Sequence, residues 1–165
     1  MIILKHLTVE RFRLLRAMNV HFPQRGSILI QGPNEAGKSA LIESIYFALY
    51  GEPLAARRGK RALDDLILYG SNTANVSLVI SVGATELTIA RAIERGRGQH
   101  ISLLIQHLGV PEVEEITDLA EANARIISEI GGIDGETLRN TSLIEQKGLT
   151  RLETIGSAER DATVR

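Results

Sequence analysis

Gln31-Gly32-Pro33-Asn34-Glu35-Ala36-Gly37-Lys38-Ser39 fits the pattern G-x-x-x-x-G-K-[ST], with Gly32 as its first glycine. The residues before it, Ser27 to Ile30, have the apolar character of a short buried strand, and Ser39 to Tyr50 after it have that of a helix. Strand, glycine loop and helix in this order are the setting in which such a loop holds the phosphates of a nucleotide. Because the pattern alone is short, this setting is what favours a phosphate-binding loop over a simple turn.

The residue types in the loop suit this chemistry. Glycines let the backbone turn tightly and bring N–H groups close to a polyphosphate, and the helix that follows points its partially positive N-terminus at the same anion. The Lys38 ammonium would neutralise the β- and γ-phosphates, and the Ser39 hydroxyl would ligate Mg²⁺, which prefers oxygen ligands. The loop therefore predicts the binding of a nucleoside triphosphate.

Length and composition predict one globular domain. The chain has 165 residues, of which 44% are hydrophobic and 4% aromatic, so its core must consist mainly of Ile, Leu, Val and Ala. A formal net charge of −1 argues against a chain that binds nucleic acid through its overall charge, and leaves local basic patches open. Without cysteine it forms no disulfide and no thiolate metal site, which suits a reducing cytoplasm.

Nothing in the sequence predicts a membrane protein. Charged residues interrupt the apolar run at the N-terminus, Met1 to His6, so we expect no signal peptide. No apolar run is long enough to cross a bilayer. We therefore expect a cytoplasmic protein without a membrane partner.

The pattern of apolar and turn residues predicts strands on both sides of the loop. Before it, strands are expected at Ile2 to Phe12 and Ala17 to Phe22. After it, Ala74 to Val82 and Glu86 to Ile93 alternate in polarity around Gly83-Ala84-Thr85, which is a hairpin signal. Two further strands are expected, at His100 to His107 and Ser142 to Gln146.

Helix signals occur between and after these strands. Gly51 and Pro53 would end the helix after the loop, and Asp118 with Glu121 would form a capping box at the start of a later one. The later helices are expected at Ala62 to Gly70, Thr117 to Ile127 and Gly135 to Asn140. The pattern is typical of an α/β fold of the P-loop class, with a mixed sheet and an antiparallel β subdomain.

Four segments together resemble a known family. They are Arg11-Phe12-Arg13, the loop at Gly32 to Ser39, the hairpin with Arg91, and Arg139-Asn140-Thr141-Ser142-Leu143-Ile144-Glu145-Gln146-Lys147-Gly148. They resemble the N-terminal half of an SbcC-type ATPase head, of the SMC and ABC-ATPase class. The last segment is the discriminating one, because it is similar to the Q-loop of these heads. The resemblance implies the N-terminal lobe of an ABC-type head over residues 1–150 and the start of a coiled-coil helix over residues 151–165.

The resemblance also implies roles for individual residues. Lys38 and Gln146 would act in catalysis, Gln146 by sensing the γ-phosphate, and Ser39 and Gln146 would reach Mg²⁺. Arg91 resembles a basic residue that couples nucleotide state to the coiled coil. ATP itself would be bound by Arg13, Gly32, Asn34, Glu35, Ala36, Gly37, Lys38, Ser39 and Ala40.

By this resemblance the whole protein would be an ATPase that acts in DNA double-strand break repair or DNA end processing. Each head would be completed by its own C-terminal half, and Mg-ATP would drive the dimerisation of two heads. Closure and hydrolysis would then move DNA ends or gate an SbcD-like nuclease.

Two departures from the family pattern matter. Glu35 stands where many members have Gly, which puts a negative side chain near the phosphate loop. The family's signature motif, Walker B acids and switch His lie in the C-terminal half, and Leu63-Asp64-Asp65 does not replace them. Without those acids the Mg²⁺ site and the hydrolytic water would be incomplete, so we expect little or no hydrolysis by this chain alone.

Other interpretations remain open at this stage. The chain could be a stand-alone nucleotide-binding module or a RecF-like DNA-binding module without hydrolysis, whereas a transporter-type ATPase fits the Phe12-Arg13 hairpin less well. A basic cluster, Arg57 to Arg61, is either a solvated loop or a contact to a phosphate backbone. The four histidines lack the paired spacing of a metal site.

Overall fold

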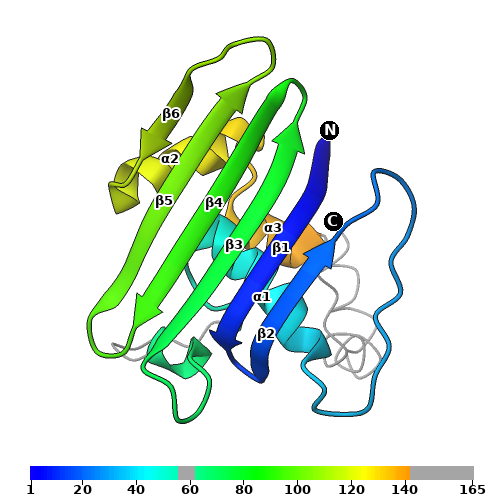
Figure 1. The fold of residues 1–165 in the computed structure, drawn as a ribbon, viewed down its shortest axis with the longest axis vertical. Coiled ribbons are helices and arrows are strands. Elements are labelled where there is room, and N and C mark those ends of the chain that lie inside the picture. The colour runs from blue at the N-terminus through cyan, green and yellow to red at the C-terminus, as the bar shows by residue number, and fades with distance from the viewer. Residues whose placement is uncertain (56–61, 142–165) are drawn as a thin grey trace, which may run out of the picture. The chain divides into compact units, whose positions relative to one another are not determined.

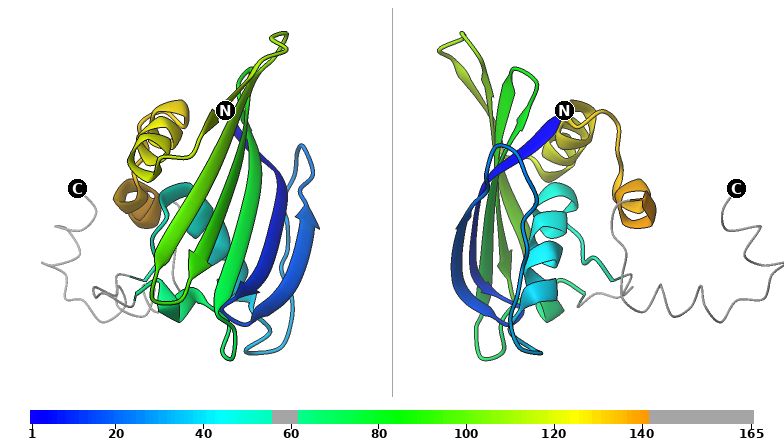
Figure 2. Two further views of the ribbon diagram at one scale, coloured as in Figure 1. Left: turned by 60° about the vertical axis from the view of Figure 1, so that its left-hand side comes forward. Right: turned by 90° about the vertical axis from the view of Figure 1, so that its right-hand side faces the viewer.

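An antiparallel sheet of six strands, in the order β2-β1-β3-β4-β5-β6, forms the body of the structure (Figure 1). This computed structural model describes residues 1–55 and 62–141. The chain divides into two units, Met1–Ile133 and Asp134–Arg165, and the whole sheet belongs to the first. Helices α1 (Lys38–Tyr50) and α2 (Leu119–Glu129) both cover one face of the sheet (Figure 2).

The strands follow the sequence pattern closely. The hairpin of β3 and β4 turns at Gly83 and Ala84, as predicted, with Val82 paired to Thr85. The sequence does not predict β6, because Pro111 and neighbouring glutamates hide its alternation. The strand bounds are β1 (Ile2–Phe12), β2 (Leu15–His21), β3 (Thr73–Val82), β4 (Thr85–Glu94), β5 (Gly98–His107) and β6 (Val113–Ile116).

One face of the sheet is apolar and packs against the helices. Alternate residues of β3 and β4 point into this core and are buried: Val76, Leu78, Ile80, Leu87 and Ile89. Each such side chain contributes about 1.5–3 kcal/mol through removal of apolar surface from water. The other face carries small or polar residues, such as Ser77, Ala90 and Ser102, which lie side by side on β3, β4 and β5.

The sequence predicts the end of α1 and the capped start of α2. Gly51 closes α1 in the left-handed conformation, with φ 69°, and its N–H donates to the Phe47 carbonyl at 2.8 Å. The Asp118 carboxylate accepts the N–H of Glu121 at 2.9 Å and so caps the start of α2. These caps satisfy backbone groups that have no partner within a helix.

The predicted strand at Ser27 to Ile30 is wrong. These residues have no regular structure, and the side chains of Ile28, Leu29 and Ile30 are 49%, 77% and 37% exposed. A strand needs a neighbour that takes up its backbone N–H and C=O groups, and no described strand pairs with this segment. The mixed sheet is wrong for the same reason, since every pairing among the described strands is antiparallel.

The predicted helix at Ala62 to Gly70 shrinks to one turn of 3₁₀ helix, η1 (Asp64–Leu66). Ile67 follows in extended conformation and bridges to Phe12, which explains why the helix stops there. The predicted strand at Ser142 to Gln146, the segment over residues 151–165 and the cluster from Arg57 to Arg61 lie outside the described residues.

The second unit begins with α3 (Gly135–Thr141). The Asp134 side chain caps this helix by accepting the N–H of Thr137 at 2.7 Å, and that bond lowers the pKa of Asp134. In the part of the chain that the structure describes, no helix has the length and apolar character to span a bilayer.

Candidate phosphate-binding site

The glycine loop packs against the first hairpin through Gly37. This residue is buried and has φ 89°, a conformation that glycine adopts freely. A Cβ atom at this position would lie 2.6 Å from Cδ2 of Leu15 on β2. The left-handed turn into α1 therefore favours glycine at position 37, and a larger residue there would also require the Leu15 side chain to move.

The N-terminus of α1 is open. No side chain caps it, and its first turn holds no acidic residue, whereas the N–H of Leu41 is the first to bond back into the helix, at 3.0 Å from the Gly37 carbonyl. The unpaired N–H groups and the positive end of the helix dipole point to an anion as their partner. The open helix start fits the predicted phosphate loop, whereas residues 27–30 before the loop do not form the predicted strand, and phosphate binding itself stays a prediction.

Lys38 closes the loop on itself. Its ammonium donates to the carbonyl oxygens of Gly32 and Pro33, each at 2.6 Å. The positive charge is therefore held against the loop backbone by two neutral acceptors. A phosphate group is a stronger hydrogen-bond partner for an ammonium than a carbonyl is. The Lys38 ammonium can therefore exchange these two bonds for bonds to a phosphate.

Glu35 carries a strained backbone. Its φ is 65°, in the left-handed region that costs a residue with a Cβ atom roughly 1–2 kcal/mol. The residue is exposed on the loop, one residue from Asn34 and two from Gly37. Glu35, which stands where many members of the resembled family have Gly, thus has a backbone conformation that favours glycine.

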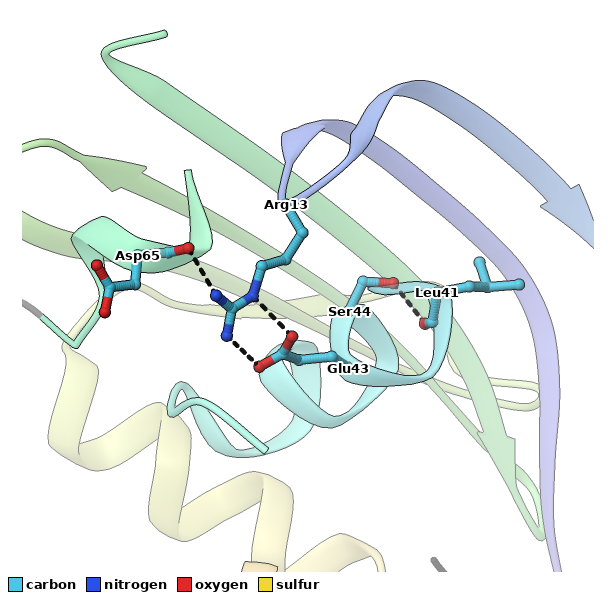
Figure 3. A network of polar contacts seen from close by, with 5 residues as sticks. All are labelled: Arg13, Leu41, Glu43, Ser44 and Asp65. Carbon is cyan, nitrogen blue, oxygen red and sulfur yellow. Dashed lines mark hydrogen bonds and ion pairs between the residues drawn. The ribbon is translucent and has the colours of Figure 1, made fainter. Parts of the chain in front are cut away.

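Arg13, predicted to contact nucleotide, reaches from the turn between β1 and β2 to α1 (Figure 3). Its Nε and Nη2 atoms each donate to the Glu43 carboxylate at 2.8 Å, and its Nη1 donates to the Asp65 carbonyl at 2.8 Å. The hydrogen bond to Glu43 raises the pKa of Arg13. Arg13 therefore ties the hairpin to α1 and to η1, beside the loop.

Glu43 is the site residue that sequence reasoning missed. It lies four residues beyond Ser39 and so on the same side of α1. The pairing with Arg13 spans 30 residues, which no local pattern reports. The signal in the sequence was Glu43 itself, an acidic residue within a mostly apolar helix, together with Arg13 in the turn of the first hairpin.

Of the two residues predicted to bind Mg²⁺, the structure describes only Ser39. Ser39 is exposed and lies in the first turn of α1, at the open helix end. Gln146 lies outside the described residues. Within residues 1–55 and 62–141, no group of three or more His, Cys, Asp or Glu side chains could hold a metal ion. The Ser39 hydroxyl fits a Mg²⁺ ion only if a nucleotide phosphate supplies further oxygens.

Comparisons with known proteins agree with this site. The AAA domain family matches residues 6–161. The SbcC component of the nuclease SbcCD from Deinococcus radiodurans is 31% identical over 146 residues, which cover 86% of this chain and 16% of that protein. The DNA double-strand break repair Rad50 ATPase of Methanocaldococcus jannaschii is 26% identical over 162 residues, which cover 98% of this chain and 15% of that protein.

A solved structure supports the fold. The recombination mediator protein RecF with bound ATP matches with a TM-score of 0.55 and 24% identity, over 62% of this chain and 27% of that one. The chain spans about one sixth of the length of the two curated relatives. The glycine loop at the open start of α1, the family match and these relatives together lead to one conclusion: the chain belongs to the AAA domain family and is distantly homologous to the N-terminal region of the SbcC and Rad50 ATPases.

Proposed function

We propose that this chain is the ATP-binding N-terminal segment of an SbcC- or Rad50-like ATPase that acts in DNA double-strand break repair or DNA end processing. The observation that carries the proposal is the open N-terminus of α1, with Lys38 held across the loop by the carbonyls of Gly32 and Pro33. Family membership implies ATP binding, and the names of the two relatives supply the DNA-repair role.

In this proposal the loop holds the triphosphate. Backbone N–H groups from Gly32 to Ala40 surround the phosphates, and Lys38 neutralises their charge. Ser39 and Gln146 would hold Mg²⁺, which would offset charge on the β- and γ-phosphates. Arg13 would exchange part of its contact with Glu43 for the nucleotide.

Ile28, Leu29 and Ile30, directly before the glycine loop, are exposed apolar residues. Their exposure suggests that another part of the protein covers this segment. Three consecutive apolar side chains in water are unfavourable unless a further element covers them. We propose that the head's C-terminal half covers this segment. The same half would supply the acids that hydrolysis needs, so this chain alone should turn over little ATP.

The remaining parts of the proposal come from the relatives. One relative is named as part of a nuclease and another as a double-strand break repair ATPase. We propose that ATP brings two heads together, that an SbcD-like nuclease is the partner, and that DNA is the substrate. The coiled-coil start over residues 151–165 belongs to this proposal too.

Reconstitution tests the proposal. The chain should hydrolyse ATP weakly by itself and faster when a C-terminal head segment with the Walker B acids is added. Lys38→Ala should abolish the gain, while Lys5→Ala, which removes the same charge from a β1 side chain paired with Glu86, should keep it. Robust hydrolysis by the chain alone, lost in Lys38→Ala, would contradict the division of labour between the halves.

A second candidate function is a RecF-like module that binds nucleotide and DNA without hydrolysis. The fold match to RecF with ATP favours it. Reconstitution separates the two candidates, because a stand-alone module would bind ATP and DNA without any gain in hydrolysis from an added C-terminal segment.

A further inference from the structure

Arg91 is a buried cation at the C-terminal end of α1. Its side chain projects from β4 into the core and is 2% exposed. The guanidinium donates to the Ala48 carbonyl at 2.7 Å and, at 3.3 Å, to the Leu49 carbonyl. Burial lowers the pKa of Arg91 to about 10, so the group stays charged at neutral pH. Its charge faces the negative end of the α1 dipole, which is where a cation stabilises a helix.

Two amide side chains complete this arrangement. Asn123 of α2 accepts from Arg91 Nη2 at 2.6 Å, and Gln99 of β5 accepts from Nη1 at 3.3 Å. Gln99 in turn donates to the carbonyl of Gly51, the residue that ends α1, at 2.8 Å. Arg91, Gln99 and Asn123, here called the Arg91 junction, thus join the end of α1 to two strands and to α2.

Gly51 is fitted to this junction. A Cβ atom at Gly51 would lie 2.6 Å from Arg91 Nη1 and 2.9 Å from the Gln99 side-chain oxygen. The end of the helix therefore lies close to the guanidinium, and a residue with a Cβ atom at this position would require the Arg91 and Gln99 side chains to move. Such contact fixes the position of the helix end along its axis as well as its rotation.

Helix α1 needs this kind of fixing. Most of its buried residues lie within one arc of about 120° on the helix, and two others, Tyr46 and Leu49, lie outside that arc near its C-terminal end. Near that end α1 is therefore buried on several sides, and because apolar packing is not directional, hydrogen bonds can add to the definition of its rotation there. Hydrogen bonds are directional, and at the other end of α1 the N-terminus is open toward the phosphate loop.

We propose that Arg91 is a positioning residue for nucleotide binding: the Arg91 junction sets the axial position and rotation of α1 and thereby the placement of Gly37 and Lys38. The inference rests on the proposed ATP site and adds to it a residue at the far end of the helix. Among the described residues no carboxylate pairs with Arg91, so its charge acts on the carbonyl end of α1 and not in an ion pair.

The test compares Arg91→Met with a core variant of the same sheet face. Ile105→Ala on β5 removes a fully buried side chain that lies away from the end of α1. We expect Arg91→Met to weaken binding of a fluorescent ATP analogue about tenfold, within the range of coupling between linked sites. Ile105→Ala should lower the melting temperature but leave the affinity of the folded protein unchanged, measured well below both melting temperatures. Equal affinities for the two variants would overturn the inference.

Further arms keep the inference testable. Gln99→Ala leaves the cation in place and removes the bond to Gly51, so it should reproduce a smaller part of the loss even if Arg91→Met does not fold. Arg91→Lys keeps the charge and should restore part of the affinity. Deuterium exchange tests the positioning of α1 even if the wild type binds no nucleotide. Faster exchange confined to α1 in Gln99→Ala would then support the positioning of α1 by the Arg91 junction. Exchange that rises evenly over the sheet would contradict it.

Discussion

Single residues set the properties of the phosphate loop. Glu35 combines a negative charge with a φ of 65°, two features that glycine would remove together. The sequence identified the charge, because Glu35 departs from the family's Gly. It did not reveal the strain, since backbone conformation in a loop depends on how the flanking residues are anchored, here by Gly37 against Leu15.

Substitutions at Glu35 separate these two features. Glu35→Gln removes the charge and keeps the strain, so it should tighten ATP binding by a few-fold through lower repulsion. Glu35→Gly should tighten binding similarly and, in addition, stabilise the folded chain by about 1 kcal/mol through relief of strain. Titration calorimetry and thermal unfolding measure the two effects. If Glu35→Gln binds ATP no better than the wild type, the charge does not act on the site.

The Arg13–Glu43 pair supplies a second residue-scale prediction. Both side chains are partly buried and the contact is bidentate, so a double-mutant cycle with Arg13→Gln and Glu43→Gln should give a coupling energy of about 1 kcal/mol. If Arg13 shifts toward bound nucleotide, saturating ATP should reduce that coupling. A coupling energy that ATP leaves unchanged would mean that Arg13 is a structural tie and not a nucleotide contact.

Among the helices and strands, short sequence patterns predicted the features that depend on neighbouring residues in the chain. The β3–β4 hairpin and the ends of α1 and α2 depend on turn glycines and caps, which short patterns report. The strand at Ser27 to Ile30 failed because a strand depends on its neighbour. The Arg91 junction was missed, although a signal existed: the alternation of Leu87, Ile89 and Ile93 places Arg91 on the core face.

The start of α3 yields a prediction about pH. The N–H of Thr137 lowers the pKa of Asp134 from its ordinary value, so the cap contributes stability above the ordinary pKa of an aspartate and loses it as the pH falls through the lowered pKa. The amide resonance of Thr137 should follow this titration in an NMR experiment. Asp134→Asn keeps an acceptor but has no proton to gain, so the same resonance should then lose its acidic transition. An unchanged transition in Asp134→Asn would assign the effect to another group.

At the scale of the whole molecule, the structure consists of an antiparallel sheet whose core is closed by α1 and α2, and of a loop whose leading apolar segment has no strand partner among the described residues. The chain spans about one sixth of its curated relatives. In the proposed head of two halves, the C-terminal half would cover this apolar segment. Sequence reasoning placed a buried strand at Ser27 to Ile30 because an apolar pattern does not report whether a partner strand is present.

Equilibrium binding shows whether the start of α1 holds a triphosphate. Titration of the chain with Mg-ATP, by calorimetry, should show saturable binding at one site. Lys38→Ala should weaken it by about a hundredfold, since it removes a charge-assisted contact worth roughly 1.5–3 kcal/mol, while Lys5→Ala should bind as the wild type does. Binding that survives Lys38→Ala unchanged, or no binding by the folded wild-type chain, would contradict the account.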